Sequence, residues 1–224
     1  MIEAKDVSKH YQTPGEDVRV LEGLNLSLGD GEAAAIVGPS GSGKTTLLNL
    51  LGALDRPSSG TIAIAGKNIA GLSEAEASAF RNRELGFVFQ QHYLLPQLSV
   101  LENVLVPRLA GGWEEEAGET RERAVELLGK VGLRDRLNHL PYQLSGGEKL
   151  RTAVARALVN KPRLVLADEP TGSLDPKTTS TVAEMFLQLN REAGVTLLMV
   201  THNESLAGQL GRVLRLEGGR LREG

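Results

Sequence analysis

Residues 33–45 read AAAIVGPSGSGKT, and this stretch decides the fold of the chain. Its first five residues are an apolar run of the kind that forms a buried strand. The next eight, residues 38–45, fit the pattern G-x-x-x-x-G-K-[ST], and leucines then recur at helical spacing from Leu47 to Leu54. A strand, a glycine-rich loop and a helix in this order predict a loop whose backbone N–H groups surround the phosphates of a nucleotide.

The chemistry of this loop points to a nucleoside triphosphate with its metal ion. Lys44 is expected to reach the β and γ phosphates, and the hydroxyl of Thr45 is expected to bind Mg²⁺, which takes few protein ligands. A glycine turn without a ligand is the alternative, but the flanking strand and helix argue against it. The expected ligands are therefore ATP and Mg²⁺, and the candidate residues are Gly38, Pro39, Ser40, Gly41, Ser42, Gly43, Lys44, Thr45 and Thr46.

A second apolar strand, residues 164–167, ends in the adjacent carboxylates of Asp168 and Glu169. Ligands gather at the carboxyl ends of parallel strands, so this pair is expected beside the phosphate loop. Asp168 is the candidate to hold Mg²⁺, and Glu169 is the candidate to polarise the water that attacks the γ-phosphate. Two solvent-exposed acids at a strand end would be the alternative if the pair stood alone.

Composition excludes several classes of protein. The chain has 224 residues, 41% of them hydrophobic and 24% charged, as in an ordinary soluble globular protein. Because it has no cysteine, disulfides, thiolate zinc sites and iron–sulfur clusters are excluded. The net charge of −3 does not indicate nucleic-acid binding. No apolar run is long enough to predict a secretory leader or direct insertion into a membrane.

Hydrophobic periodicity predicts alternating strands and helices along the chain. Strands are expected at residues 2–7, 24–28, 33–37, 61–65, 85–90, 164–167 and 195–200, and helices at 44–54, 73–83, 146–159 and 176–192. Residues 91–140 are expected to be helical with breaks at Pro107 and at Gly111 and Gly112. This alternation predicts parallel strands with crossover helices, and no linker divides the chain, so one domain is expected over residues 1–224.

A second glycine motif, LSGGE at residues 144–148, precedes a predicted helix and offers another anion site. Together with Arg151 and the segment AVARAL at 153–158, it resembles the signature of ATP-binding cassette (ABC) ATPases, with Glu148 where glutamine is commoner. The resemblance covers nearly the whole chain. It implies an α/β fold: a P-loop NTPase core with a mostly parallel sheet, an N-terminal antiparallel β subdomain, and a helical subdomain at about residues 91–160 that contains the signature.

This resemblance also implies how the site is assembled. In such ATPases two subunits form a homodimer around ATP, and the phosphate loop of one faces the signature of the other, here Ser145, Gly146, Gly147 and Glu148. Tyr11 resembles the aromatic residue that stacks on adenine, and Gln90 the glutamine that touches Mg²⁺ or the attacking water. His202 resembles the histidine that contacts the γ-phosphate, and Asp175, with Ser173 and Leu174, the loop that crosses the dimer interface. Taken alone, Tyr11 and His202 could equally be structural residues.

Finer similarity lies in residues 90–96, 101–104 and 169–175, which look like the bacterial lipoprotein-releasing (LolD) and macrolide-exporter-type (MacB) ATPases. Such ATPases work with integral membrane permease subunits of four transmembrane helices. The chain is then expected to be cytoplasmic and peripheral on the inner membrane, with residues 91–140 as the surface that receives the partner. Ser173, where asparagine is common, and the pair Lys149 and Leu150 depart from the pattern.

Three other interpretations remain open. A soluble ABC-type ATPase acting on ribosomes or DNA usually carries tandem cassettes or a long coiled coil, for which 224 residues leave no room. A phosphate-loop kinase would leave residues 144–148, Gln90 and His202 unexplained. The ATPase of a cell-division or stress-sensing membrane complex would share all these motifs. The sequence indicates an ATPase subunit, but it does not indicate which molecule the transporter moves.

Overall fold

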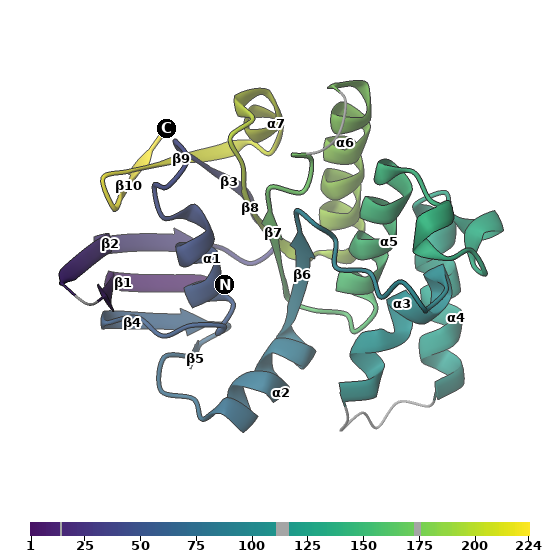
Figure 1. The fold of residues 1–224 in the computed structure, drawn as a ribbon, viewed down its shortest axis with the longest axis horizontal. Helices are drawn as coiled ribbons and strands as arrows, with labels where there is room; N and C mark the ends of the chain where they lie inside the picture. The colour runs from purple at the N-terminus through teal and green to yellow at the C-terminus, as the bar shows by residue number, and fades with distance from the viewer. Residues whose placement is uncertain (14, 111–116, 173–175) are drawn as a thin grey trace.

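The computed structural model describes residues 1–13, 15–110, 117–172 and 176–224, and it contains two β-sheets with α1 between them (Figure 1). The N-terminal sheet is antiparallel and has the strand order β2-β1-β4-β5. Its strands are β1 (Ile2–Thr13), β2 (Glu16–Leu28), β4 (Ser59–Ile64) and β5 (Lys67–Asn68).

The main sheet contains the strand that precedes the phosphate loop and the strand that ends at Asp168. Its strand order is β10-β9-β3-β8-β7-β6, and β9, β3, β8, β7 and β6 run parallel. The strands are β3 (Ala33–Val37), β6 (Leu85–Phe89), β7 (Leu164–Asp168), β8 (Thr196–Val200), β9 (Arg212–Glu217) and β10 (Arg220–Glu223). The carboxyl ends of β3, β8, β7 and β6 therefore lie side by side, and the loops that follow them share one edge of the sheet.

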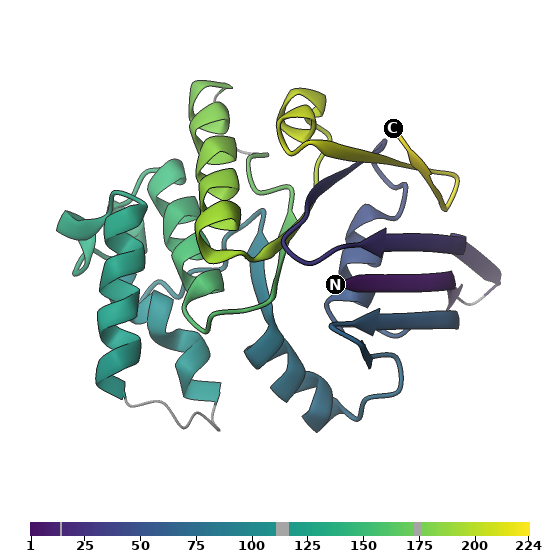
Figure 2. The same ribbon diagram turned by 180° about the vertical axis from the view of Figure 1, so that it is seen from behind.

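Most helices lie at the end of the molecule away from the N-terminal sheet, where α3, α4, α5 and α6 form a group (Figure 2). The helices are α1 (Lys44–Leu51), α2 (Glu74–Glu84), α3 (Val100–Leu105), α4 (Ala117–Lys130), α5 (Gly146–Leu158), α6 (Pro176–Ala193) and α7 (Glu204–Gln209), with short 3₁₀ turns η1 (Val106–Ala110), η2 (Arg134–Arg136) and η3 (Pro141–Gln143). Ser73, Ser99 and Ser145 each begin a helix with a capping box, which fixes the starts of α2, α3 and α5.

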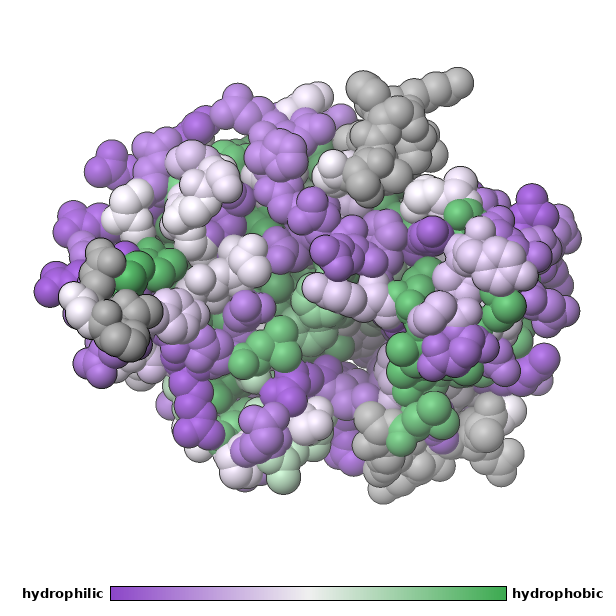
Figure 3. All heavy atoms as spheres, in the orientation of Figure 1, coloured by the Kyte–Doolittle hydropathy of each residue, from purple (hydrophilic) through white to green (hydrophobic). Residues whose placement is uncertain are grey.

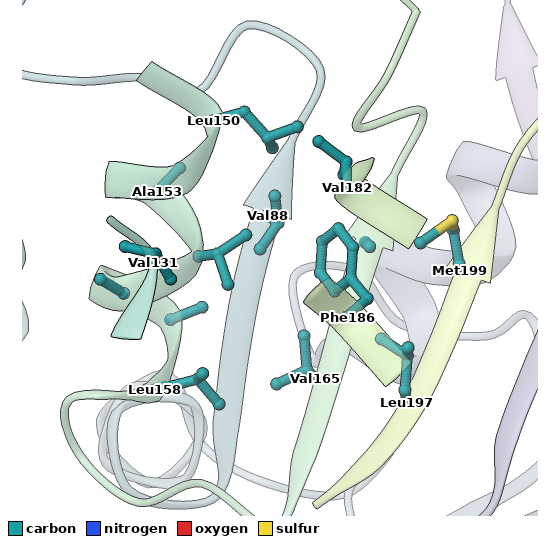
Figure 4. Close-up of a cluster of buried hydrophobic side chains, with 14 of the residues drawn as sticks. Val88, Val131, Leu150, Ala153, Leu158, Val165, Val182, Phe186, Leu197 and Met199 are labelled. Carbon is teal, nitrogen blue, oxygen red and sulfur yellow. The ribbon is translucent and has the colours of Figure 1, made fainter. Parts of the chain in front are cut away.

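Successive side chains along a strand point to opposite faces of the main sheet, so the core consists of two hydrophobic clusters, one on each face. Val165 of β7 and Leu197 of β8 face α5 and α6, where Phe186 lies next to them and Leu150 lies beside Val88 and Val182 in the same cluster (Figure 4). On the opposite face of the sheet, the side chain of Leu166 belongs to a cluster that contains the leucines of α1 and the N-terminal sheet. The helices α1 and α5 therefore lie on opposite faces of the main sheet.

The structure confirms most of the predicted elements and corrects one. The strands at 33–37 and 164–168 and the helices at 74–84 and 146–158 match the sequence pattern closely, whereas β1 and β2 are longer than predicted. Residues 91–99 are not helical, so that prediction was wrong. The buried side chain of Asn103 accepts a hydrogen bond from the N–H of Leu95 at 2.7 Å and donates to the carbonyls of Leu95, Leu98 and Ser99, and these bonds hold the segment as a turn.

Candidate nucleotide-binding site

The phosphate loop joins β3 to α1, and its glycines are required by the space around them. Gly43 caps the helix with a φ of 98°, and a Cβ there would lie 3.0 Å from the side chains of Val20 and Leu21. A Cβ at Gly38 would collide with the backbone carbonyl of Leu216. The loop therefore follows a path that larger residues cannot take, with the positive end of α1 inside it.

Two polar groups of this loop suit an anion. Lys44 is 8% exposed, and its ammonium donates to the loop carbonyls of Gly38 and Pro39 at 2.8 and 3.0 Å. The hydroxyl oxygen of Ser42 is buried and has no hydrogen-bond partner. Because a buried hydroxyl without a partner is costly, a ligand oxygen that accepts a hydrogen bond from it would stabilise the loop. The loop thus fits a polyphosphate.

Asp168 meets the start of α1 across the edge of the sheet. The hydroxyl of Thr45 donates to its Oδ1 at 3.4 Å, so the predicted approach of β7 to the phosphate loop is confirmed. Burial raises the pKa of Asp168 and the charge of Glu169 adds to this, while Thr45 and Lys44 act against it. A cation at this carboxylate would offset the cost of its burial. Among the described residues no group of three or more His, Asp or Glu could hold a metal ion, but Mg²⁺ commonly takes one or two protein ligands and completes its shell with phosphates and water.

Glu169 faces a different neighbour from Asp168. Its backbone N–H bonds to the carbonyl of Val200 at 2.9 Å, which ties the end of β7 to the end of β8. Its Oε2 accepts a hydrogen bond from the backbone N–H of His202 at 3.1 Å and lies 2.9 Å from His202 Nδ1. The φ of Glu169 is 43°, an uncommon conformation for a residue with a side chain, and such strain is often found at functional sites.

Gln90 lies beside the loop that follows Glu169. A Cβ added to Gly172 would come within 2.9 Å of the Gln90 amide nitrogen, so the absence of a side chain at Gly172 leaves space for the side chain of Gln90. The N–H of Gly172 in turn donates to the carbonyl of Glu169 at 3.1 Å. The structure therefore brings Gln90, Asp168, Glu169 and His202 together at the edge that carries the phosphate loop.

Tyr11 projects from β1 toward the same loop. Its hydroxyl donates to Asp55 Oδ2 at 2.8 Å, and the neighbouring side chain of Thr46 acts against the rise in the pKa of this phenol. The side chain of Lys9 lies over its ring, with the ammonium 4.7 Å from the ring centroid. Sequence reasoning missed Lys9 and Asp55, because they are 46 residues apart and neither belongs to a recognisable motif.

The signature residues lie elsewhere. Ser145 begins α5, and its backbone N–H and hydroxyl both donate to Glu148 Oε2 at 2.8 Å. Arg136 donates to Glu148 Oε1 at 3.2 Å. Within one chain, α5 and α1 are on opposite faces of the main sheet, so Ser145, Gly146, Gly147 and Glu148 do not join the phosphate loop of their own subunit. Asp175, with Ser173 and Leu174, lies outside the residues that the structure describes.

Comparisons with known proteins agree with this geometry. The family model "ABC transporter" matches residues 21–172. The chain is 51% identical to "Lipoprotein-releasing system ATP-binding protein LolD 1" of Rhodopirellula baltica, over 99% of this chain and 96% of that protein. It is 49% identical to "Lipoprotein-releasing system ATP-binding protein LolD" of Geobacter metallireducens, over 99% and 97%.

A solved structure described as "Dimeric Structure of MJ0796, a Bacterial ABC Transporter Cassette" superposes with a TM-score of 0.91 at 41% identity, over 100% of this chain and 98% of that one. The predicted fold class is thereby confirmed. The family model covers more than half of the chain and the relatives cover nearly all of it. The chain belongs to the ABC transporter family, as one of its ABC-type ATPases.

Proposed function

We propose that the chain is the ATP-hydrolysing subunit of a lipoprotein-releasing transporter and that it works as a homodimer on the cytoplasmic face of the inner membrane. The observation that carries this proposal is the convergence of Lys44, Thr45, Asp168 and Glu169 at one sheet edge. The similarity to LolD proteins over nearly the full length supports the lipoprotein-releasing branch.

Each residue has a distinct part in hydrolysis. Glu169 acts as the general base that takes a proton from the attacking water, and His202 holds its carboxylate in place and contacts the γ-phosphate. Lys44 leaves the loop carbonyls and neutralises the β and γ phosphates. Thr45 and Asp168, with Gln90, would hold Mg²⁺. When bound, this ion shields the charge that develops on the phosphates.

The placement of the signature supports a dimer. Ser145, Gly146 and Gly147 form the start of α5 on the face of the sheet opposite α1, so this anion site cannot serve the phosphate loop of its own chain. A second copy would supply it, with Glu148 orienting Ser145 and with Asp175 at the interface. The MJ0796 cassette, which shares this fold, is described as dimeric.

A groove beside Gln90 is suited to a membrane partner. It has a volume of about 410 Å³ and is lined mostly by apolar side chains, among them Leu54, Phe87, Phe89, Tyr93 and Pro107. Tyr93 is 60% exposed, and hydrophobic residues gather in the middle of the face of the molecule drawn in Figure 3. We assign the groove to a short amphipathic helix from a permease subunit of four transmembrane helices. Among the described residues no helix is long and apolar enough to cross a membrane, so the spans would come from that partner.

The proposal is tested by capture from membranes. A Glu169→Gln variant with ATP, mixed with detergent-solubilised membranes of its own host, is expected to retain a permease with a large periplasmic domain, identified by mass spectrometry. Adding Tyr93→Asp in the groove should release that partner and leave ATP binding unchanged. Capture of ribosomal proteins or DNA without a membrane protein would refute the proposal in favour of a soluble ABC-type ATPase.

A further inference from the structure

Lys9 carries a positive charge on a side chain that is almost completely buried. It is 9% exposed, and its ammonium donates to Asp55 Oδ1 at 2.7 Å and to the carbonyl of Arg56 at 2.8 Å. Burying a charge is costly even when it is paired, so such a pair is weak as a device for stability alone. Its position suggests a more specific use, because the same ammonium lies over the ring of Tyr11.

Asp55 links the two residues through its two oxygens. Oδ1 accepts from Lys9, and Oδ2 accepts from the hydroxyl of Tyr11 at 2.8 Å. Burial by itself would raise the pKa of Asp55, but the hydrogen bonds from Lys9, Tyr11 and the backbone of Arg56 outweigh it and lower the pKa. Burial and Asp55 raise the pKa of Tyr11, so the phenol remains a donor at neutral pH. Both hydrogen bonds are therefore charge-assisted.

The three side chains come from two elements that meet at the site. Lys9 and Tyr11 are two residues apart on β1, and both side chains bond the carboxylate of Asp55, so they lie on one side of the strand. Asp55 follows α1, the helix that begins at the phosphate loop. The ring of Tyr11 is thus tethered at its hydroxyl and covered by the ammonium, while the residue as a whole is still 39% exposed.

We infer that Lys9 and Asp55 are positioning residues that hold the Tyr11 ring as a fixed platform for the base of the nucleotide. A ring that is already held loses little conformational freedom when a base stacks on it, so more of the stacking energy appears as affinity. A cation over one face also draws electron density from the ring, which favours stacking of an electron-rich purine on the other face. This inference rests on the proposed adenine-stacking role of Tyr11.

The test compares two ligands that share the phosphates and differ in the base: Mg-ATP and the Mg complex of inorganic triphosphate. Calorimetry on the full chain gives the Kd of each. Tyr11→Ala should weaken ATP binding by about 5- to 100-fold and leave triphosphate binding unchanged, because only ATP carries a base. Asp55→Ala should weaken ATP binding by about 3- to 10-fold, again without effect on triphosphate.

A double-mutant comparison separates positioning from a purely structural role. In a Tyr11→Ala background, Asp55→Ala should cost no further ATP affinity, because no ring is left to position. Tyr11→Phe, which keeps the ring and removes the tether, should match Asp55→Ala, and it serves in its place if that variant does not fold. Glu3→Ala is the matched control, since it removes the carboxylate of an ion pair with Lys5 at the opposite end of β1.

The possible failures are distinguishable. If Asp55→Ala weakens ATP and triphosphate equally, or keeps its full effect without the ring, Asp55 merely supports α1 and the inference is overturned. If Tyr11→Phe and Lys9→Met bind ATP as the wild type does while Tyr11→Ala does not, the stacking role stands and the positioning role is overturned. If Tyr11→Ala itself leaves ATP binding unchanged, the proposed role of Tyr11 fails, and the inference fails with it.

Discussion

Replacing Lys44 with alanine tests the phosphate loop in two ways at once. The ammonium makes two hydrogen bonds to loop carbonyls, and a bond to a charged group contributes about 1.5–3 kcal/mol. Because water can reach part of the emptied space, we expect a net loss of about 1–3 kcal/mol. In a chain of this size each kcal/mol corresponds to roughly 2–4 °C in Tm. The variant without ligand should therefore unfold about 2–12 °C below the wild type.

The second effect concerns ATP. Ligand at 100 times its Kd stabilises a protein by about 2.7 kcal/mol. Loss of one charged contact to phosphate, about 3 kcal/mol, weakens binding by roughly 100-fold. At the same ATP concentration the stabilisation of Lys44→Ala then falls to about 0.4 kcal/mol, so the shift of about 5–10 °C seen for the wild type should shrink to less than about 2 °C.

Thermal unfolding with and without Mg-ATP measures both quantities. Lys5→Ala is the control, because Lys5 forms an exposed ion pair with Glu3, and such pairs contribute about 0–1 kcal/mol. It should keep the full ATP shift. An unchanged Tm of ligand-free Lys44→Ala would show that the two hydrogen bonds do not hold the loop. An unchanged ATP shift would refute the role of Lys44 in binding phosphate.

Two further predictions concern α5. Its Glu148 accepts hydrogen bonds from the backbone and hydroxyl of Ser145 and from Arg136, and these lower its pKa, so the stability that it contributes is present above pH 4.5 and is lost as the pH falls through the lowered pKa. The difference in unfolding free energy between the wild type and Glu148→Ala, measured with urea, should accordingly be full at pH 7 and shrink in acid, and a difference that does not vary with pH would contradict this. Arg156 donates to the carbonyls of His92 and Tyr93, both at positive φ, so Arg156→Ala should lower the unfolding free energy by about 2–4 kcal/mol and Arg156→Lys, which lacks the planar fork, should recover only part of it. Full recovery by lysine would show that charge alone is sufficient.

The sequence predicts those parts of the molecule that local chemistry determines. The phosphate loop is recognisable because Gly38 and Gly43 occupy positions where a Cβ has no room, so the pattern is strict. The starts of α2 and α5 are recognisable because Ser73 and Ser145 are each followed three residues later by glutamate. Buried strands such as β7 are recognisable because both of their faces are covered.

The remaining features depend on contacts between distant residues. The turn at residues 91–99 is imposed by the buried amide of Asn103, whose four hydrogen bonds override a helical pattern. The strands β9 and β10 alternate charged and apolar residues on either side of Gly218 and Gly219, a β-hairpin signal that sequence reasoning missed, whereas the pairing of β9 with β3 follows only from the fold. The pairing of Lys9 with Asp55 likewise follows from the fold and not from any local motif.

The measurement that tests the central claim most directly is the behaviour of Glu169→Gln with ATP. Glutamine keeps the size of the side chain and can still accept a hydrogen bond from His202, but it cannot take a proton from water. Gel filtration should show an ATP-dependent dimer, and phosphate release should fall by about 100-fold or more. Phosphate release at the wild-type rate would contradict the assignment of Glu169 as the base, and a monomer with ATP bound would contradict the shared site.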